Sequence, residues 1–278
     1  HRPYLCKLPS GKQIVLFFYQ GAISQDIAFK GLLGDGNRFA QSILSSFQPQ
    51  IHEDQLCHVA TDGESYGHHH RHGDMALAYC LETLEQHPEV KLTNYAEYLS
   101  HHKPCWEVEI HENSSWSCVH GIERWRAHCS CNSGMHPQWN QHWRGPLRET
   151  FDWLRDKLNL VFENEVGLFC QDVWQLRNQY IEVILNRGEQ CLETFLRGNC
   201  TADLSEKEKT HLLRMLEMQR HALLMYTSCA WFFDEISGIE TTQVLQYADR
   251  AIQLAESESD IKLEQEFLHR LSQAKGNH

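Results

Sequence analysis

The sequence predicts an α/β part followed by an all-α part. Strand-sized apolar runs at residues 14–19 (IVLFFY) and 55–61 (QLCHVAT) alternate with helical patterns in the first part. After about residue 112 helical patterns dominate, as expected for a separate all-α region. The composition, 41% hydrophobic and 22% charged over 278 residues, is typical of a globular chain with a substantial core. We therefore expect two domains, residues 1–112 and 113–278.

The first part begins with strand and helix signals in alternation. The continuous apolar run at 14–19 indicates a strand buried on both faces, as in parallel sheets. A turn at Gln20 and Gly21 precedes a helical stretch that carries Ile27 and Leu33. A second helix is expected after the Gly34-Asp35-Gly36 break, with its apolar stripe at 39–47.

Residues 55–61 are predicted to form a second buried strand, followed by a loop and a helix over about 72–86. Asn94, with Glu97 three residues later, predicts the start of a short helix. Residues 106–110 (WEVEI) alternate apolar and acidic side chains and could form a last strand.

In the second part, the expected helix starts carry recognisable signals. Pro146 suits the first turn of a helix. Ser205 with Glu208, and Ser237 with Glu240, have the spacing of capping boxes, and we expect the second of these to open the last helix.

Charge and composition exclude several classes of function. A net charge of -12 disfavours nucleic acid and anionic membranes as partners, because both require a basic surface. The first residues lack the apolar region of a signal peptide, and the eleven cysteines fit reduced thiols, so we expect a cytoplasmic protein. Phosphate-binding glycine loops and the GxSxG elbow are not found in the sequence, and we expect no cofactor.

The strongest local signal is the triplet Asp62-Gly63-Glu64 at the end of the predicted strand 55–61. Parallel α/β folds bind ligands at the carboxyl ends of strands, so these two carboxylates could share a pocket. They could then act as acid and base or accept hydrogen bonds from sugar hydroxyls. Tyr66 adds a flat ring and a hydroxyl group. The other interpretation is an acidic turn at the start of a helix.

A histidine run follows directly. His68, His69, His70 and His72 could ligate a metal or could line a substrate pocket as polar loop residues. Consecutive residues cannot all converge on one ion, and HExxH spacing does not occur, so we expect no metal at this run.

Residues 111–145 gather cysteine, histidine and tryptophan. Cys118, Cys129 and Cys131 occur there with three histidines, His120, His128 and His136, but the Cys-x-Cys pair is not the usual CxxC of a zinc knuckle. Whether this cluster binds metal stays open. Tryptophans in this region suit stacking against sugar rings, and we select Trp116 and Trp139 as candidates; burial in the core is the alternative.

These residues also carry a family resemblance. TDGESYGHHHRHGDMALAY at 61–79 resembles the last conserved motif of glycoside hydrolase family 57, and FFYQGAISQDIAF at 17–29 resembles a degenerate form of the preceding motif. ENSSWSC, HPQWNQHWRGPLRE and WFFDEISGIE resemble the subgroup that carries the domain of unknown function 3536.

The resemblance implies the C-terminal portion of an incomplete (β/α)7 barrel followed by a helical domain. It also implies a two-carboxylate retaining mechanism on α-glucosidic linkages, with the nucleophile motif expected upstream of His1. The acid/base motif carries Gln25 where the family has Asp, with Asp26 one place later, so Asp26 is the candidate acid. Asp62 and Glu64 are carried over as pocket carboxylates, and Tyr66, His68, His69 and His70 as substrate contacts.

Three hypotheses follow. The first is a glycoside hydrolase or glucanotransferase that acts on an oligosaccharide or α-glucan, inactive as this chain alone, with an upstream barrel half as a possible partner. The second is a non-catalytic carbohydrate-binding or regulatory protein on a degenerate glycosidase barrel. The third is a metal-dependent hydrolase that uses the histidine run.

Overall fold

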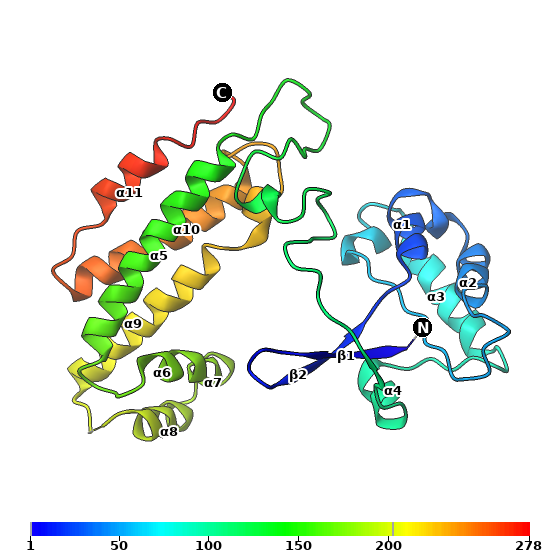
Figure 1. Ribbon diagram of the computed structural model, residues 1–278, viewed down its shortest axis with the longest axis horizontal. Helices are drawn as coiled ribbons and strands as arrows, with labels where there is room; N and C mark the ends of the chain where they lie inside the picture. The colour runs from blue at the N-terminus through cyan, green and yellow to red at the C-terminus, as the bar shows by residue number, and fades with distance from the viewer. Residues whose placement is uncertain (1, 202) are drawn as a thin grey trace. The chain divides into compact units, whose positions relative to one another are not determined.

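A computed structural model describes residues 2–201 and 203–278, and the chain divides into two compact units between His111 and Glu112. The first unit combines a three-stranded sheet with short helices, and the second consists of helices and a long irregular segment (Figure 1). The chain therefore has a mixed α/β architecture in which the strands belong to the first unit.

The sheet of the first unit has the strand order β2-β1-β3. Strand β1 (Pro3–Lys7) pairs antiparallel with β2 (Gln13–Phe17) and parallel with β3 (Trp106–Glu107). The hairpin closes at Gly11, whose φ of 80° lies in the left-handed region that glycine adopts freely. The parallel pair joins the two ends of the first unit.

The strand predicted at 14–19 forms, but its predicted burial is wrong. It ends at Phe17, and the Ile14 and Phe18 side chains are 50% and 56% exposed. Strand β2 is an edge strand of a small hairpin, so it has an antiparallel neighbour on one side instead of parallel neighbours on both.

The predicted strand at 55–61 is also wrong, because this segment has an extended course without strand pairing. The backbone carbonyl of His58 accepts a hydrogen bond from the Gln20 N–H (2.8 Å). The Ala60 N–H donates to the side-chain oxygen of Ser24 (3.2 Å). These two bonds connect the segment to the first turn of the helix at 21–29. The backbone groups of His58 and Ala60 thus bind Gln20 and Ser24 and not a neighbouring strand.

The helices predicted for the first unit form, although the first ends at Phe29 and leaves Leu33 in a separate 3-10 turn. They are α1 (Gly21–Phe29), α2 (Gly36–Leu44), α3 (Gly73–Glu85) and α4 (Tyr95–His101), with 3-10 turns η1 (Leu32–Gly34) and η2 (Gly63–Tyr66). Asp35 caps α2 by accepting from the backbone N–H groups of Asn37 and Arg38. Asn94 caps α4 in the same way, by accepting from Glu97 N–H. A small apolar core joins α1, α2 and α3 around the fully buried Ile27.

The second unit is built on three long helices that lie side by side, α5 (Arg144–Val166), α9 (Glu206–Leu224) and α10 (Ile239–Glu258) (Figure 1). The remaining elements are α6 (Val173–Gln179), α7 (Ile181–Leu185), α8 (Glu189–Asn199), α11 (Glu264–Leu271), η3 (Glu123–Trp125) and η4 (Ser228–Trp231). Helix α11 packs against α5. The apolar stripe of α5 is fully buried in the core, because its residues recur at helical spacing: Leu147, Phe151, Leu154 and Leu158.

The helix-start signals of the second unit have different outcomes. Ser205 and Glu208 form a reciprocal capping box at the start of α9, as predicted. The box predicted at Ser237 is wrong: Gly238 occupies the N-cap of α10, and no side chain caps this helix. Nor is α10 the last helix, because α11 follows it.

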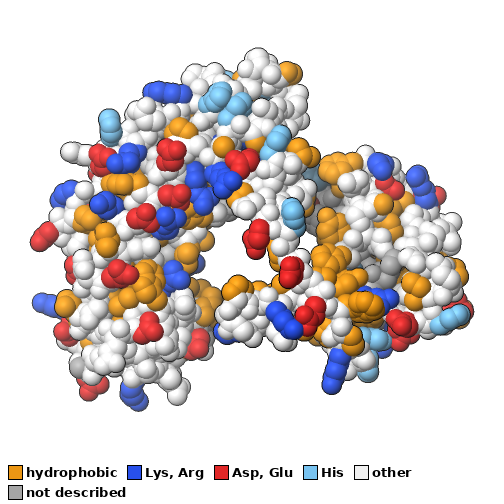
Figure 2. Space-filling view, in the orientation of Figure 1, with side chains coloured by type: hydrophobic (Ala, Val, Ile, Leu, Met, Phe, Trp, Pro, Cys, Tyr) orange, Lys and Arg blue, Asp and Glu red, His pale blue; other side chains and the backbone are white. Residues whose placement is uncertain are grey.

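The surface of the first unit carries many large apolar side chains. Figure 2 shows hydrophobic side chains gathered on the visible face of this unit, whereas acidic and basic side chains are interspersed over the helical unit. The most exposed of the apolar side chains are Phe29 (84%), Met75 (64%) and Trp106 (57%). Within residues 2–201 and 203–278, the helices are all too short or too polar to cross a bilayer.

Candidate functional site

Asp62 and Glu64 flank the start of the 3-10 turn η2, and both are exposed. The turn is closed by backbone bonds. Ser65 N–H donates to the Asp62 carbonyl (3.1 Å), and His68 and His69 N–H both donate to the Glu64 carbonyl (3.0 and 2.9 Å). The backbone of both acids is thus fixed by the turn, while their carboxylates lie at the surface of the first unit.

The turn is held against the rest of the unit by close packing. Ser65 is buried, and a Cβ added at Gly73 would lie 3.1 Å from the Ser65 carbonyl oxygen, tighter than ordinary contact. A larger residue at the start of α3 would therefore require the turn or Leu33 to shift by a few tenths of an ångström. The Thr61 hydroxyl donates to the Tyr66 hydroxyl (3.0 Å), which fixes the ring of Tyr66 beside the turn.

Asp26 lies on α1, half-buried, and its carboxylate pairs with the Lys30 ammonium at 2.8 Å. The neighbouring Gln25 is exposed, and Ser24 is buried, where its hydroxyl donates to the Gln20 carbonyl (2.9 Å). The predicted acid is therefore engaged in an i,i+4 ion pair on its own helix.

In the histidine run, some side chains are exposed to solvent and one contacts a neighbouring helix. His68 and His69 are exposed, with their rings edge to face at 5.0 Å. The Nε2 atom of His70 lies 3.0 Å from the Ala28 carbonyl oxygen, so His70 connects this loop to α1. Among the residues that the structure describes, the group of three or more possible metal ligands that comes together lies outside this run.

The tryptophans of residues 111–145 fall into two classes. Trp116 is 83% exposed, and the ring of Trp139 stacks on His136 at 3.8 Å near the surface. Trp125 and Trp143 pack against the helical core and donate from their indole N–H groups to the Ser228 and Asp234 carbonyls (3.1 and 3.3 Å). Of the two predicted sugar-stacking residues, Trp116 is exposed, whereas Trp139 is half-buried against His136.

The same segment brings together Cys118, His120, Cys129 and Cys131, whose ligand atoms all lie within 4.8 Å of one another. His128 lies outside this group and accepts the Gln141 N–H through Nδ1 (3.2 Å). Burial disfavours the Cys118 thiolate, but hydrogen bonds from the backbone and ring of His120 and from the neighbouring thiols outweigh it and lower the pKa of Cys118 to about 6.

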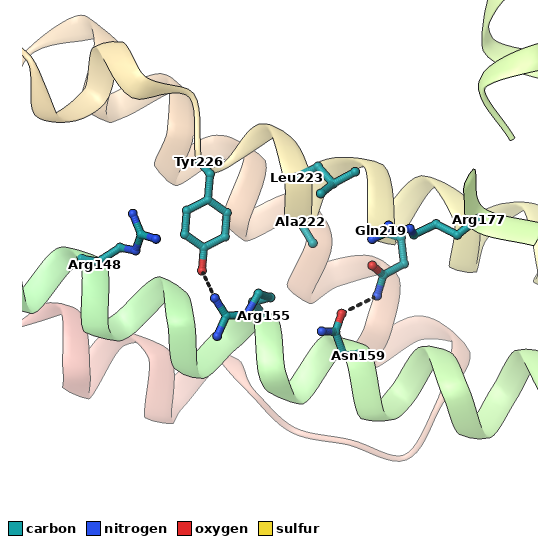
Figure 3. A pocket seen from close by; sticks show the side chains of 8 residues that line it. All are labelled: Arg148, Arg155, Asn159, Arg177, Gln219, Ala222, Leu223 and Tyr226. Atoms are coloured by element: carbon teal, nitrogen blue, oxygen red, sulfur yellow. Dashed lines mark hydrogen bonds between the residues drawn. The ribbon is translucent and has the colours of Figure 1, made fainter. Parts of the chain in front are cut away.

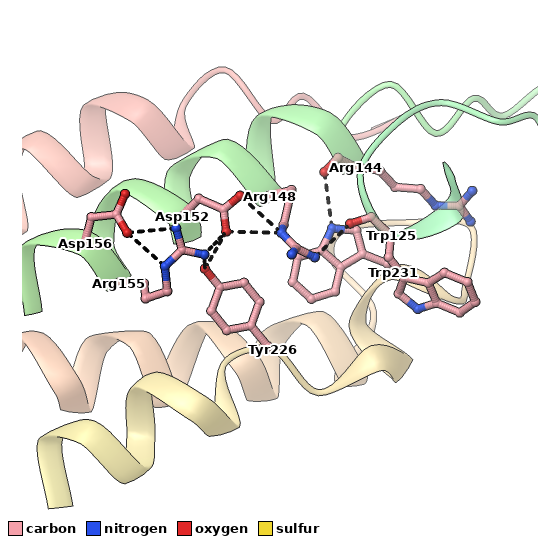
Figure 4. A network of polar contacts seen from close by, with 8 residues as sticks. All are labelled: Trp125, Arg144, Arg148, Asp152, Arg155, Asp156, Tyr226 and Trp231. Carbon is pink, nitrogen blue, oxygen red and sulfur yellow. Dashed lines mark hydrogen bonds and ion pairs between the residues drawn. The ribbon is translucent and has the colours of Figure 1, made fainter. Parts of the chain in front are cut away.

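Sequence reasoning missed a cavity of about 220 Å³ in the helical unit (Figure 3). Arg148, Arg155 and Arg177 line it together with Gln219 and other residues of α5, α6 and α9. No local pattern could have indicated it, because its arginines come from separate turns and helices. Two of these arginines already form ion pairs with an acidic side chain. In the network of Figure 4, Arg148 and Arg155 both bind the carboxylate of Asp152, at 3.2 and 2.9 Å.

Two family models match the chain. Residues 1–111 match the model described as Glycosyl hydrolase family 57, and residues 139–278 match the model described as Domain of unknown function (DUF3536). No protein with a curated description matches.

A solved structure has a similar fold. It is described as a novel exo-type maltose-forming amylase from Pyrococcus sp. ST04, with a TM-score of 0.68 and 16% sequence identity. The alignment covers 97% of this chain and 50% of the amylase, so the chain spans about half the length of that protein. Since the match to the second family model takes in half of the sequence, the chain belongs to the DUF3536 family, with a segment of glycosyl hydrolase family 57 type ahead of that domain.

Proposed function

We propose that the chain is part of a carbohydrate-active protein that hydrolyses or transfers α-glucosidic linkages of an oligosaccharide or α-glucan. The observation that carries this proposal is the match of residues 1–111 to glycosyl hydrolase family 57, together with two exposed carboxylates, Asp62 and Glu64, on a rigid turn within that segment. The fold shared with a maltose-forming amylase is consistent with it.

In this proposal Asp62 and Glu64 contact the substrate, and Tyr66 and the exposed histidines His68 and His69 form the rim of the site. A retaining mechanism requires two carboxyl groups about 5 to 5.5 Å apart. We propose that Asp62 and Glu64 form one side of such a site, and that the partner carboxylate comes from a further part of the barrel. His70 would act by positioning, since its ring already contacts the backbone of α1.

The apolar surface of the first unit fits a barrel partner. Its buried core is small, whereas Ile14, Phe18 and Phe29 expose large apolar side chains in the same unit. Exposed apolar surface of this kind is typical of an interaction site. We propose that further barrel strands cover it, which is also what the amylase, twice as long as this chain, suggests.

A second candidate is a non-catalytic carbohydrate-binding or regulatory protein on a degenerate barrel. The specific observation that favours it is the engagement of the candidate acid, Asp26, by Lys30, with Gln25 beside it. In that case the exposed carboxylates and Trp116 would bind sugar without turnover.

The test is calorimetric titration of the chain with maltohexaose, with parallel chromatography of the products. We expect binding by the wild-type chain and at least about tenfold weaker binding by the Asp62→Asn, Glu64→Gln double variant, because the sugar hydroxyls lose charge-assisted acceptors. Glu89→Gln, an exposed acid of the same unit, is the matched control and should bind as wild type.

The outcomes separate the candidates. In an active form of the protein, a loss of product formation by the double variant that exceeds its loss of binding supports an enzyme. Binding by the wild type without products in any form supports the second candidate. Equal binding and equal turnover in the double variant and the wild type would remove the site assignment.

A further inference from the structure

Residues 112–143 form a segment that is irregular apart from the 3-10 turn η3. Long segments without helix or strand need another source of order, such as a metal or a disulfide. All eleven cysteines of the chain are free thiols in the structure. The group Cys118, His120, Cys129 and Cys131 lies in this segment.

We propose that Cys118, His120, Cys129 and Cys131 bind one Zn²⁺ ion in a structural site. With Zn–S bonds of about 2.3 Å and Zn–N bonds of about 2.0 Å, tetrahedral geometry places two sulfur ligands about 3.8 Å apart and a sulfur and a nitrogen ligand about 3.5 Å apart. Cys118 Sγ lies 3.8 Å from Cys129 Sγ and 3.7 Å from Cys131 Sγ.

Two of the three sulfur distances to the imidazole agree as well. His120 Nδ1 lies 3.7 Å from Cys118 Sγ and 3.4 Å from Cys131 Sγ. A disulfide would need sulfur atoms about 2.05 Å apart, so the spacing fits ligands around a central ion better than oxidised pairs. Four protein ligands leave no open position, which is typical of a structural zinc and not of a catalytic one.

The local backbone is shaped to make these two ligand pairs. The N–H of Gly121 donates to the Cys118 carbonyl (3.1 Å) and closes a tight turn that holds Cys118 and His120 together. Gly121 has a φ of 73°, and a Cβ there would lie 2.0 Å from the Asn113 carbonyl oxygen, so only glycine fits. In the second pair, Ser130 adopts a left-handed φ of 64° between Cys129 and Cys131.

The charge around the group also fits a metal with three thiolates. Zn²⁺ with three thiolates has a net charge of -1. The side chain of Arg144 is fully buried, and its Nη1 atom lies 3.7 Å from Cys129 Sγ and donates to the Cys131 carbonyl (3.0 Å). The hydrogen bonds described for the Arg144 side chain go to the Cys129 sulfur and to backbone carbonyls. A buried guanidinium requires compensating negative charge. The nearby Asp234 carboxylate supplies part of it, and the metal–thiolate group would supply a further part beside Cys129.

The proposed ion also explains the segment 231–235 (WFFDE). Arg144 donates to the Phe232 and Phe233 carbonyls (3.3 and 3.1 Å), and the Asp234 carboxylate accepts from the Ser133 N–H (2.9 Å). Residues 231–235 of the helical unit are thus the surface on which the segment with the proposed ligands packs. The zinc would fix the fold of residues 112–143 on the three-helix core and take no part in sugar chemistry.

Elemental analysis of the purified chain tests the proposal. We expect about one equivalent of zinc per chain, with three thiols converted to thiolates and their protons released to solvent. Cys118→Ser and Cys131→Ser should each weaken zinc binding by at least about tenfold, measured by competition with a chromophoric chelator. Cys105→Ser and Cys229→Ser, which replace exposed thiols, are the matched controls and should retain the metal.

A cysteine variant could fail to fold, so two further measurements are included. His120→Gln changes an exposed ligand and should lower zinc affinity while far-ultraviolet circular dichroism stays native. The chain stripped of metal should bind Co²⁺ with the thiolate-to-cobalt charge-transfer band of a tetrahedral sulfur site. A chain from zinc-supplemented culture that holds less than about a tenth of an equivalent of zinc, or iron in its place, would overturn the assignment. The result is independent of sugar binding.

Discussion

Arg144 lies fully buried beneath Cys129, with its Nη1 atom 3.7 Å from the cysteine sulfur. Burial disfavours the charged guanidinium and lowers the pKa of Arg144, while the neighbouring Cys129, Asp234 and Cys131 act in the opposite direction. This one side chain connects the ligand-bearing segment to the helical core, because its other nitrogen donates to the Phe232 and Phe233 carbonyls.

Replacing Arg144 by methionine should therefore destabilise the helical unit by about 3 kcal/mol or more, because carbonyls of Cys131, Phe232 and Phe233 lose a charged donor in the protein interior. Urea denaturation followed by circular dichroism measures the change. Arg197→Met, at an exposed position of α8, should change stability by less than about 0.5 kcal/mol. Equal midpoints for the two variants would contradict the assigned role of Arg144.

Glycine substitutions separate steric fit from backbone strain. Gly121 and Gly134 both have left-handed φ angles, 73° and 80°, but a Cβ at Gly134 meets nothing within 4 Å. Gly134→Ala should cost about 1–2 kcal/mol from the left-handed backbone alone. Gly121→Ala should cost clearly more and also release metal, since its Cβ would overlap the Asn113 carbonyl. Thermal unfolding and metal content are the measurements; a Gly121→Ala chain as stable as Gly134→Ala would exclude the close approach.

Two serines test the capping rule within one unit. Ser205→Ala should destabilise the chain by about 1 kcal/mol, because the Ser205 side chain accepts the Glu208 N–H at the start of α9. Ser237→Ala should be nearly neutral, since Gly238 and not Ser237 holds the N-cap of α10. Denaturant midpoints give both values, and a larger effect at Ser237 than at Ser205 would show that the cap assignment is wrong.

Tyr226 gives a pH-dependent prediction. Its hydroxyl donates to Asp152 Oδ1 (2.6 Å), and burial first, then this carboxylate, raises the pKa of Tyr226. A folded-state pKa above the unfolded value of about 10 stabilises the fold below pH 10, and this contribution is lost as the pH rises above 10. Tyr226→Phe should lower stability at neutral pH by about 1.5–3 kcal/mol and flatten the alkaline decline. Tyr79→Phe, at an exposed tyrosine, is the control. If the free energy of unfolding falls with pH above 10 equally steeply in Tyr226→Phe and in the wild type, the prediction is refuted.

Helices could be predicted well from the sequence because their signals are local. The stripe of α5 and the box at Ser205 depend only on spacing within one or two turns. Strands could not, because pairing depends on distant residues. The apolar run at 55–61 has the composition of a strand, but its described hydrogen bonds go to a loop and to Ser24. Strand β1 was missed, although Pro9 and Gly11 after it are hairpin signals.

In the candidate sites, too, local features could be predicted from the sequence and features that depend on distant residues could not. Asp62 and Glu64 could be placed on a turn from sequence, since a glycine between two acids is a local signal, but their exposure could not. The group around Cys118 could not be selected, because CxH and CxC pairs converge only through the left-handed backbone at Gly121 and Ser130. The contribution of Arg144 depends on carbonyls almost ninety residues further along the chain.

The parallel pairing of β1 with β3 has a consequence for biosynthesis. Tyr4 pairs with Trp106 and Leu5 with Glu107, so the first strand meets its second neighbour only when almost the whole first unit has been synthesised. Contacts of such long sequence separation form late and slow folding. On the ribosome, the hairpin of β1 and β2 is therefore complete early, while its other edge waits for the last residues of the unit to emerge.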